Sequence, residues 1–189
     1  MIETPVRFIR GILGYMRDPA VRMDDFDEYL GIGEKAPEFT LPTIDGEDWT
    51  LSNHQGRYVV LEFGSYTCPM YRRQIPGMAR LARNFDDENV EFALIYQKEA
   101  HPNQGQFIDI DEPETFQERK RLAERLAEEE DVPMTILVDD LPRNVSAEYG
   151  GGPNMLYIVD PKGEITYKSL WANAPAVEGF LERTLRDGT

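Results

Sequence analysis

The sequence has few cysteines and few basic residues. Its one cysteine, Cys68, excludes an internal disulfide, a resolving cysteine within the chain and a cysteine-rich zinc site. A lone cysteine suits a reducing compartment, so we expect a cytoplasmic protein. Asp and Glu total 35 against 20 Lys and Arg, which gives a net charge of -15. Such an acidic surface repels phosphate backbones and anionic membranes, so we expect no nucleic-acid partner.

The sequence also lacks long apolar runs. No stretch reaches the roughly 20 apolar residues that a membrane-spanning helix needs, so we expect no integral membrane segment. Residues 1–32 are expected to form an N-terminal helical extension, because arginines interrupt the apolar positions of its first half. That helix is expected to lie on the domain. The alternative is a peripheral membrane helix, and its exposed aromatic residues offer a possible homodimer surface.

Residues 33–189 have the length of one domain. Short runs rich in β-forming residues predict strands at 58–63, 90–96, 135–138, 155–159 and 164–168. Between the first two runs, Tyr71, Ile75 and Met78 share one face of a helix that begins at Pro69. This order predicts a parallel strand–helix–strand unit with a right-handed crossover.

The remaining elements complete one fold. Helices are expected at about 114–130 and 175–186, and Asp45-Gly46 predicts a hairpin turn near the N-terminus. A short turn joins the last two strands, so they are expected to pair antiparallel. The sequence therefore predicts an α/β thioredoxin-like fold, a central mixed β-sheet flanked by helices, with an N-terminal helix and a β-hairpin extension. Asp139 and Asp140 are expected on a solvated face.

Cys68 lies where a predicted strand ends and a predicted helix begins. Unpaired N–H groups at a helix N-terminus favour a thiolate, and Arg72 and Arg73 one turn later add positive charge. Ser65 and Thr67 offer hydroxyl groups to the sulfur or to a substrate. These features predict a lowered pKa and a nucleophilic sulfur. The alternative is a buried cysteine that acts as a small hydrophobic residue.

Two further residues are expected near Cys68. His101 follows the second central strand, in a loop that opens at the same edge of the sheet, and can act as a general acid or base. Glu99 is expected to orient this imidazole or raise its pKa; the alternative is an exposed loop histidine beside an exposed glutamate. Pro153, after three glycines, is expected as a cis proline facing the cysteine of a thioredoxin fold. No residue group has metal-ligand spacing.

Several segments resemble one known family. The run 33–41 and the strand leading to Cys68 resemble the redoxin superfamily, which is AhpC/TSA-like and has the thioredoxin fold. Residues 63–69 (FGSYTCP) are similar to the signature of the iodothyronine deiodinases. Residues 99–102 (EAHP) and 149–153 (YGGGP) resemble the second and third motifs of that family.

The resemblance implies reductive chemistry at Cys68, the dehalogenation of a small aromatic substrate or related thiol redox chemistry. The proton-handling residues that it implies are Glu99, His101, Tyr96, Ser65 and Thr67. The predicted substrate-binding residues are Arg72, Pro153 and Tyr66. Because Tyr66 stands where deiodinases usually carry another cysteine, an external thiol such as thioredoxin or glutathione must reduce the oxidised sulfur. No bound cofactor is expected.

Two alternatives remain open. The first is a one-Cys peroxiredoxin-like peroxidase that reduces peroxides with an external thiol, although Ser65 and Leu61 stand where peroxiredoxins usually have threonine and proline. The second is a non-catalytic thioredoxin-fold binding module with an inert cysteine.

Overall fold

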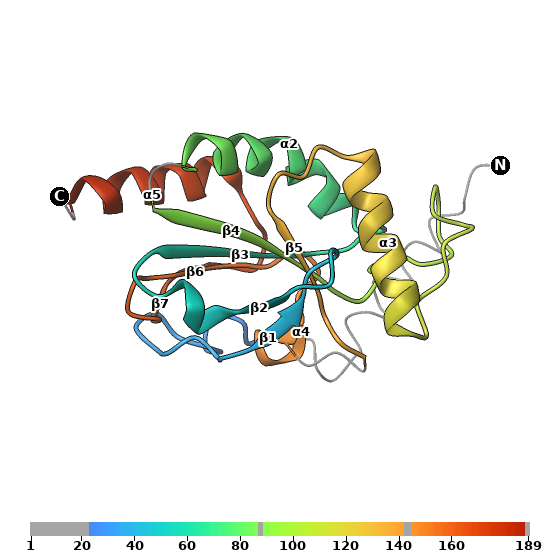
Figure 1. The fold of residues 1–189 in the computed structure, drawn as a ribbon, viewed down its shortest axis with the longest axis horizontal. Coiled ribbons are helices and arrows are strands. Elements are labelled where there is room, and N and C mark those ends of the chain that lie inside the picture. The colour runs from blue at the N-terminus through green and yellow to red at the C-terminus, as the bar shows by residue number, and fades with distance from the viewer. Residues whose placement is uncertain (1–22, 87–88, 142–144, 188–189) are drawn as a thin grey trace.

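A five-stranded mixed sheet forms the centre of the molecule (Figure 1). The computed structural model describes residues 23–86, 89–141 and 145–187. The sheet has the order β5-β4-β3-β6-β7, made of β3 (Tyr58–Gly64), β4 (Val90–Tyr96), β5 (Thr135–Val138), β6 (Leu156–Val159) and β7 (Ile165–Ser169). The central strand β3 pairs parallel with β4 and antiparallel with β6, and β6 pairs antiparallel with β7. The predicted strand–helix–strand unit and C-terminal hairpin are confirmed.

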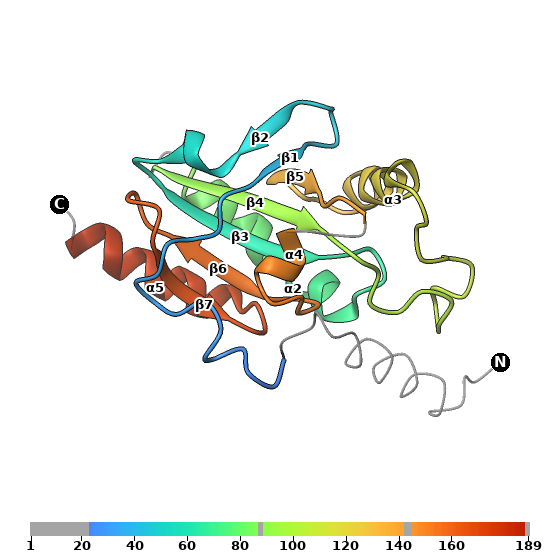
Figure 2. The same ribbon diagram turned by 90° about the horizontal axis from the view of Figure 1, so that it is seen from below.

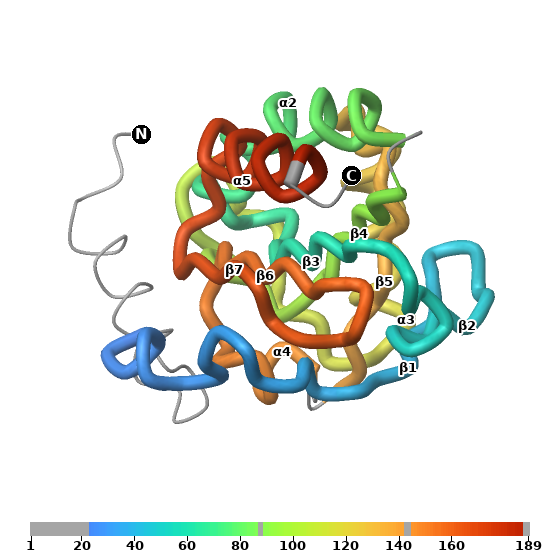
Figure 3. The backbone as a smooth tube through the Cα atoms, turned by 90° about the vertical axis from the view of Figure 1, so that its left-hand side faces the viewer, coloured from blue at the N-terminus to red at the C-terminus, as the bar shows by residue number. Residues whose placement is uncertain are grey.

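Helices pack on both faces of this sheet. They are α2 (Pro69–Asn84), α3 (Phe116–Glu129), α4 (Val145–Glu148) and α5 (Ala174–Asp187). Figure 3 shows α2 and α5 together on one face and α4 on the opposite face. Helix α3 begins slightly later than expected because Thr115 and Glu118 form a capping box. The Thr115 hydroxyl accepts the Glu118 N–H at 3.3 Å, and the Glu118 carboxylate accepts the Thr115 N–H at 3.1 Å.

The predicted hairpin extension is also confirmed. Strands β1 (Thr40–Pro42) and β2 (Asp48–Thr50) pair antiparallel, and a short 3₁₀ helix, η1 (Leu51–His54), follows. Gly46 takes a φ of +89° in the turn, a conformation that glycine adopts without strain, and its N–H donates to the Thr43 carbonyl at 3.0 Å. The hairpin packs on the face of the sheet opposite α2.

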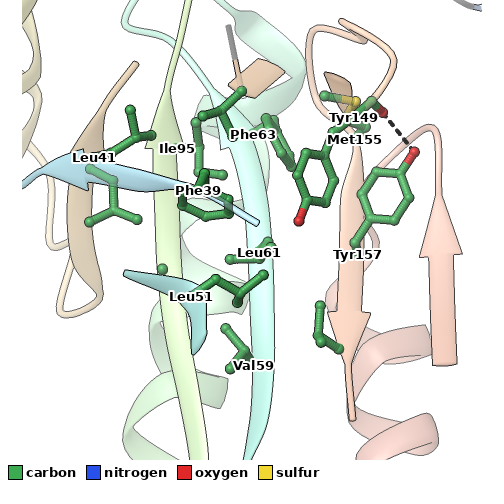
Figure 4. Close-up of a cluster of buried hydrophobic side chains, with 14 of the residues drawn as sticks. Phe39, Leu41, Leu51, Val59, Leu61, Phe63, Ile95, Tyr149, Met155 and Tyr157 are labelled. Carbon is green, nitrogen blue, oxygen red and sulfur yellow. Dashed lines mark hydrogen bonds between the residues drawn. The ribbon is translucent and has the colours of Figure 1, made fainter. Parts of the chain in front are cut away.

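Alternate residues of β3 supply two separate cores. Phe63 points toward the hairpin face, where it packs with Phe39, Tyr149 and Tyr157 (Figure 4). The Tyr157 hydroxyl donates to the Tyr149 carbonyl at 2.7 Å, which satisfies a buried polar group within this core. Val60 belongs to the core under α2 and α5. Burying each such side chain stabilises the fold by about 1.5–3 kcal/mol, so both faces of β3 anchor the domain.

The expected N-terminal helix falls largely on residues 1–22, outside the described residues, as does its possible dimer surface. The described part of the extension packs against the domain: Lys168 Nζ donates to the carbonyls of Phe26, Asp27 and Tyr29 at 2.8, 2.9 and 2.8 Å. Among the residues that the structure describes, no helix has the length and apolar character needed to cross a membrane.

The expectation that Asp139 lies on a solvated face is wrong. Asp139 is fully buried, and its carboxylate accepts the N–H groups of Val145 and Ser146 at 3.2 and 3.1 Å and the Ser146 hydroxyl at 2.5 Å. These bonds hold the first turn of α4 against the end of β5. Asp140 is exposed, as expected.

Gly64 leaves no room for a side chain. A Cβ atom at this position would lie 2.4 Å from ring carbons of Tyr71, too close for any packing without movement. We expect Gly64→Ala to lower the free energy of unfolding by about 1–3 kcal/mol through overpacking, measured by urea denaturation. Gly31→Ala is the matched control, because its Cβ would meet Glu34 at an ordinary 3.5 Å. Equal stability of the two variants would contradict the close contact.

Candidate active site

Cys68 caps the N-terminus of α2, as predicted. Its Sγ accepts the backbone N–H of Tyr71 at 3.5 Å, and its own N–H donates to the Ser65 carbonyl at 3.1 Å. Pro69 occupies the start of the helix, where a missing N–H costs nothing. Figure 2 shows β3 and β4 side by side, and Gly64 pairs with Tyr96 at their carboxyl ends. The turn with Cys68 and the loop after β4 therefore share one edge of the sheet.

The expected lowering of the Cys68 pKa is wrong. The residue is only 2% exposed, and burial raises the pKa of its thiol to about 11. The carboxyl groups of Glu99 and Glu62 raise it further, while the Tyr71 N–H opposes them. The thiol of the resting protein is therefore protonated at neutral pH, so any reaction needs a group that removes its proton.

The arginines do not supply the expected activating charge. The guanidinium of Arg72 pairs with Glu130, and its carbon lies 4.8 Å from the centre of the Tyr66 ring. Arg73 is exposed. Tyr66 also lies under Arg125, whose carbon is 4.7 Å from the ring centre. Arg72 and Arg125 thus enclose an aromatic side chain, and each pairs with a carboxylate.

A buried carboxylate joins most of the predicted site residues. Glu99 Oε2 accepts the backbone N–H and the hydroxyl of Thr67 at 2.7 and 2.6 Å. Glu99 Oε1 accepts the hydroxyl of Tyr96, whose oxygen accepts the N–H of Tyr66 at 3.1 Å. The hydroxyl of Thr67 accepts the N–H of His101 at 3.0 Å. The structure therefore brings Thr67, Glu99, Tyr96 and the backbone of His101 together beside Cys68.

The electrostatics of this network follow from its burial. Burial raises the pKa of Glu99, although the hydrogen bonds from Thr67 and Tyr96 oppose the shift. The expectation that Glu99 raises the pKa of His101 is wrong: the imidazole is half-buried, and burial lowers its pKa, while a contact with Gln104 opposes this. Its Nδ1 lies 3.4 Å from Gln104 Oε1. A neutral imidazole both donates and accepts one proton, which suits general acid–base chemistry near pH 7.

Two site residues escaped the sequence analysis. Glu112 Oε2 accepts the backbone N–H of Glu99 at 3.1 Å, and Glu112 Oε1 lies 3.7 Å from Arg119 Nη2. Burial raises the pKa of Glu112 to about 7, and the charge of Glu99 adds to the shift. Arg119 is fully buried, and its Nη1 donates to the carbonyls of Asp139 and Asp140 at 3.0 and 2.9 Å. This pair connects the loop that carries Glu99 to α3 and β5.

The remaining predicted residues lie around the same edge. The hydroxyl oxygen of Ser65 is buried and has no hydrogen-bond partner among the described residues. Pro153 lies in the loop before β6, which Gln97 holds against the end of β4 by donating its Nε2–H to the Gly152 carbonyl at 2.7 Å. The roles of Ser65 and Pro153, and the cis bond expected at Pro153, stay predictions.

A cavity of about 300 Å³ opens beside Tyr66. It is lined by Tyr66, Arg72, Gln106, Phe107, Asp109, Ile110 and Arg125. Two predicted substrate-binding residues, Tyr66 and Arg72, thus line one hollow. Its walls combine two aromatic rings with two guanidinium groups and one carboxylate, and neither Cys68 nor His101 lines it. No group of three or more metal-ligating side chains occurs in the described part of the chain.

The central sheet and the cysteine at the start of α2 define a redoxin of thioredoxin fold. Residues 32–168 match the AhpC/TSA family, and the chain belongs to that family. The predicted fold class is confirmed.

Known relatives also support the resemblance to deiodinases. The chain is 29% identical over 171 residues to a thyroxine 5-deiodinase of Gallus gallus, covering 86% of this chain and 63% of that protein. It is 30% identical over 152 residues to the thyroxine 5-deiodinase of Homo sapiens, covering 76% of this chain and 49% of that protein. The chain thus spans between about half and two thirds of the length of these relatives. The predicted likeness to deiodinases is confirmed as a distant one.

Solved structures share the fold. The thioredoxin domain of a thiol-disulfide oxidoreductase from Bacteroides vulgatus aligns with a TM-score of 0.60 and 21% identity, over 80% of this chain and 98% of that chain. A thiol:disulfide interchange protein of the thioredoxin family from Chlorobium tepidum aligns with a TM-score of 0.61 and 14% identity, over 81% of this chain and 97% of that chain. At these identities the likeness concerns the fold alone.

Removing the hydroxyl of Thr67 tests the network. We expect Thr67→Val to lower the free energy of unfolding by about 1–3 kcal/mol, because it removes one of the hydrogen bonds to the buried Glu99 carboxylate and the hydroxyl that accepts the His101 N–H. Thr40→Val is the control: its hydroxyl bonds Thr50 at 2.7 Å on the surface, and we expect a change within about 0.5 kcal/mol. Urea denaturation measures both free energies of unfolding. Equal losses would contradict the prediction that the buried Thr67–Glu99 bond stabilises the fold more than a surface hydrogen bond does.

Proposed function

We propose that this chain is a cysteine-dependent oxidoreductase that removes a halogen from a small aromatic substrate by reduction, with Cys68 as the nucleophile. The observation that carries the proposal is the hydrogen bonding of Glu99 to Thr67, which fixes the E-A-H-P loop beside Cys68. Membership of the AhpC/TSA family and the deiodinase relatives support thiol redox chemistry. The two aromatic rings and two guanidinium groups that line the cavity beside Tyr66 support an aromatic substrate, although Cys68 itself does not line this cavity.

In the first step, the sulfur of Cys68 attacks the halogen of the substrate. A sulfur–halogen bond forms as the carbon–halogen bond breaks, and the electron pair left on the aromatic carbon takes a proton. The imidazole of His101 is the proton donor in this proposal, and its backbone is held by Thr67. The carbon is reduced and the sulfur is oxidised to a sulfenyl halide. The thiol proton of Cys68 passes to His101 and replaces the proton that the imidazole delivers to carbon.

In the second step, an external thiol restores Cys68. One thiol displaces halide from the sulfenyl sulfur, which gives a mixed disulfide and a hydrogen halide. A second thiol then attacks the mixed disulfide, releases Cys68 as a thiol and leaves as the oxidised disulfide. Cys68 is the only cysteine of the chain, so both reducing thiols come from outside it. Thioredoxin or glutathione has the chemistry that this step needs.

The burial of Cys68 favours a second candidate, the reduction of peroxides. A thiol that is 2% exposed admits a small peroxide with less movement than an aromatic ring. The sulfur would attack one peroxide oxygen, release an alcohol or water and become a sulfenic acid, which the external thiol then reduces. The same cysteine serves both reactions, so the substrate decides between them.

Halide release separates the candidates. With an iodinated or brominated phenol and excess thiol, we expect halide release that Cys68→Ser abolishes and His101→Ala lowers by about 10²–10⁴-fold. His54→Ala is the control, because His54 stacks on Trp49 away from the site, and its rate should equal that of the native protein. Consumption of peroxide without halide release would favour the peroxidase. If neither reaction occurs and Cys68 is inert, the result would favour the non-catalytic binding module.

A further inference from the structure

Glu112 is a carboxyl group that the proposed reaction does not use. It lies in the segment between β4 and α3, its side chain is 33% exposed, and it lines a cavity of about 660 Å³ together with residues of that segment and of α3. Its Oε2 accepts the N–H of Glu99, a residue that is 1% exposed, at 3.1 Å. One carboxyl group therefore links a surface cavity to the buried network beside Cys68.

The E-A-H-P loop (residues 99–102) is held at two backbone groups. The Glu99 N–H donates to Glu112, and the His101 N–H donates to the Thr67 hydroxyl at 3.0 Å. The two acceptors come from separate segments, one before α3 and one before α2. We call the loop closed when both bonds are present. Because the two N–H groups are only two residues apart, losing either acceptor loosens the backbone that carries the imidazole.

A buried guanidinium holds Glu112 in its turn. Arg119 Nη2 lies 3.7 Å from Glu112 Oε1, and Arg119 Nη1 donates to the carbonyls of Asp139 and Asp140, just after β5, at 3.0 and 2.9 Å. Arg119 is 1% exposed, and a cation buried so deeply needs partners. The position of Glu112 is therefore fixed relative to the central sheet through α3.

Glu99, Glu112 and Arg119 form one charge cluster. Burial raises the pKa of Glu112 to about 7, the charge of Glu99 adds to the shift, and Arg119 and Lys98 oppose it. Burial also raises the pKa of Glu99, and Arg119 is among the groups that oppose this shift. With one proton the cluster has no net charge, and without it two carboxylates share one guanidinium. Around the cavity, the other charged groups are Asp109, Asp111, Glu114, Glu118, Arg121 and Arg125.

We propose that Glu112 is a positioning residue for His101: the neutral cluster of Glu112, Glu99 and Arg119 keeps the E-A-H-P loop closed, and loss of its one proton loosens the loop. The inference rests on the proposed function, in which the closed loop places the imidazole for proton transfer. When the proton is lost, the O–H bond of Glu112 breaks and water takes the proton. The cluster then has one negative charge, and nothing is oxidised or reduced. Glu112 acts on the reaction only through the backbone of Glu99.

The direction of the pH effect follows from linkage. In an open loop Glu112 faces water and has its ordinary pKa of 4.5, against about 7 in the closed loop. The closed loop therefore binds the proton more tightly than the open loop does. The contribution of this proton to closure is fully present below about pH 4.5 and is lost as pH rises to about 7.

Amide hydrogen exchange of Glu99, followed by NMR, tests closure without any substrate. At pH 6 we expect Glu112→Ala to lower the protection of this N–H about tenfold, which corresponds to the net contribution of one hydrogen bond. Glu112→Gln should keep the protection within about threefold, because its amide oxygen can accept the same N–H. Glu114→Ala is the matched control: Glu114 is exposed, lines the same cavity, and should leave the protection unchanged. Native protection in Glu112→Ala would overturn the inference.

The pH profile distinguishes a proton-linked contact from a merely structural one. We expect the protection factor of the Glu99 N–H in the native protein to fall as pH rises through about 7. Glu112→Gln cannot ionise, so its protection factor should stay constant over the same range. Parallel profiles in the two proteins would overturn the proton link. This comparison does not need Glu112→Ala, so it decides the question even if that variant fails to fold.

Kinetics connect the loop to the reaction. In the halide-release assay at pH 6, we expect Glu112→Ala to lower kcat about 10–100-fold through misplacement of the imidazole, and Glu112→Gln to restore it to within about threefold. KM should stay within about twofold, because Glu112 does not line the cavity beside Tyr66. A native kcat in a Glu112→Ala protein that has lost protection at Glu99 would overturn the positioning role. No halide release from the native protein, with the exchange results as expected, would overturn the proposed function alone.

Discussion

The bonds between Thr67 and the Glu99 carboxylate join two loops that are separate in sequence. One loop follows β3 and leads into α2, and the other follows β4. The parallel pairing of these strands brings their carboxyl ends to one edge, and the carboxylate then fixes the distance between them. Tyr96, His101 and Glu112 all attach to this one connection. The position of the cysteine relative to the imidazole loop depends on it.

Much of this arrangement could be read from the sequence. The buried runs of β3 and β4 follow from their apolar, β-branched composition, and the helical spacing that starts at Pro69 sets the junction where Cys68 lies. Parallel pairing then places the E-A-H-P loop at the same edge. What could not be read is which carboxylates are buried. Asp139 caps α4 and Glu112 holds the Glu99 loop, and nothing in their neighbouring residues distinguishes them from surface acids.

The burial of two other charged residues, Arg119 and Glu62, could be inferred from the sequence. Arg119 stands three residues after Phe116 and four before Ala123, on the apolar face of α3, where a basic residue calls for buried acceptors. Glu62 interrupts the run YVVLEF, otherwise typical of a strand covered on both faces. A charged residue inside an apolar pattern therefore indicates a buried charged group.

The pKa of Cys68 is raised where the sequence predicts a lowered value, and the sizes of the two opposing effects explain the difference. A helix N-terminus contributes about 0.3–1 kcal/mol to a nearby anion, whereas complete burial shifts a pKa by up to about 3–5 units, equivalent to several kcal/mol. Burial therefore outweighs the dipole at a sulfur that is 2% exposed. Sequence position shows that a residue lies at a helix start, but not how deeply the surrounding loops cover it.

The covering of Cys68 also bears on the order of events during turnover. In the proposed cycle, oxidant and reductant must reach a single sulfur beneath the same loops, and the sulfur carries a covalent adduct between their visits. They therefore cannot occupy the site together, and the first product must depart before the thiol enters. This geometry imposes a ping-pong sequence, in which the apparent second-order rate constant for one partner does not depend on the concentration of the other.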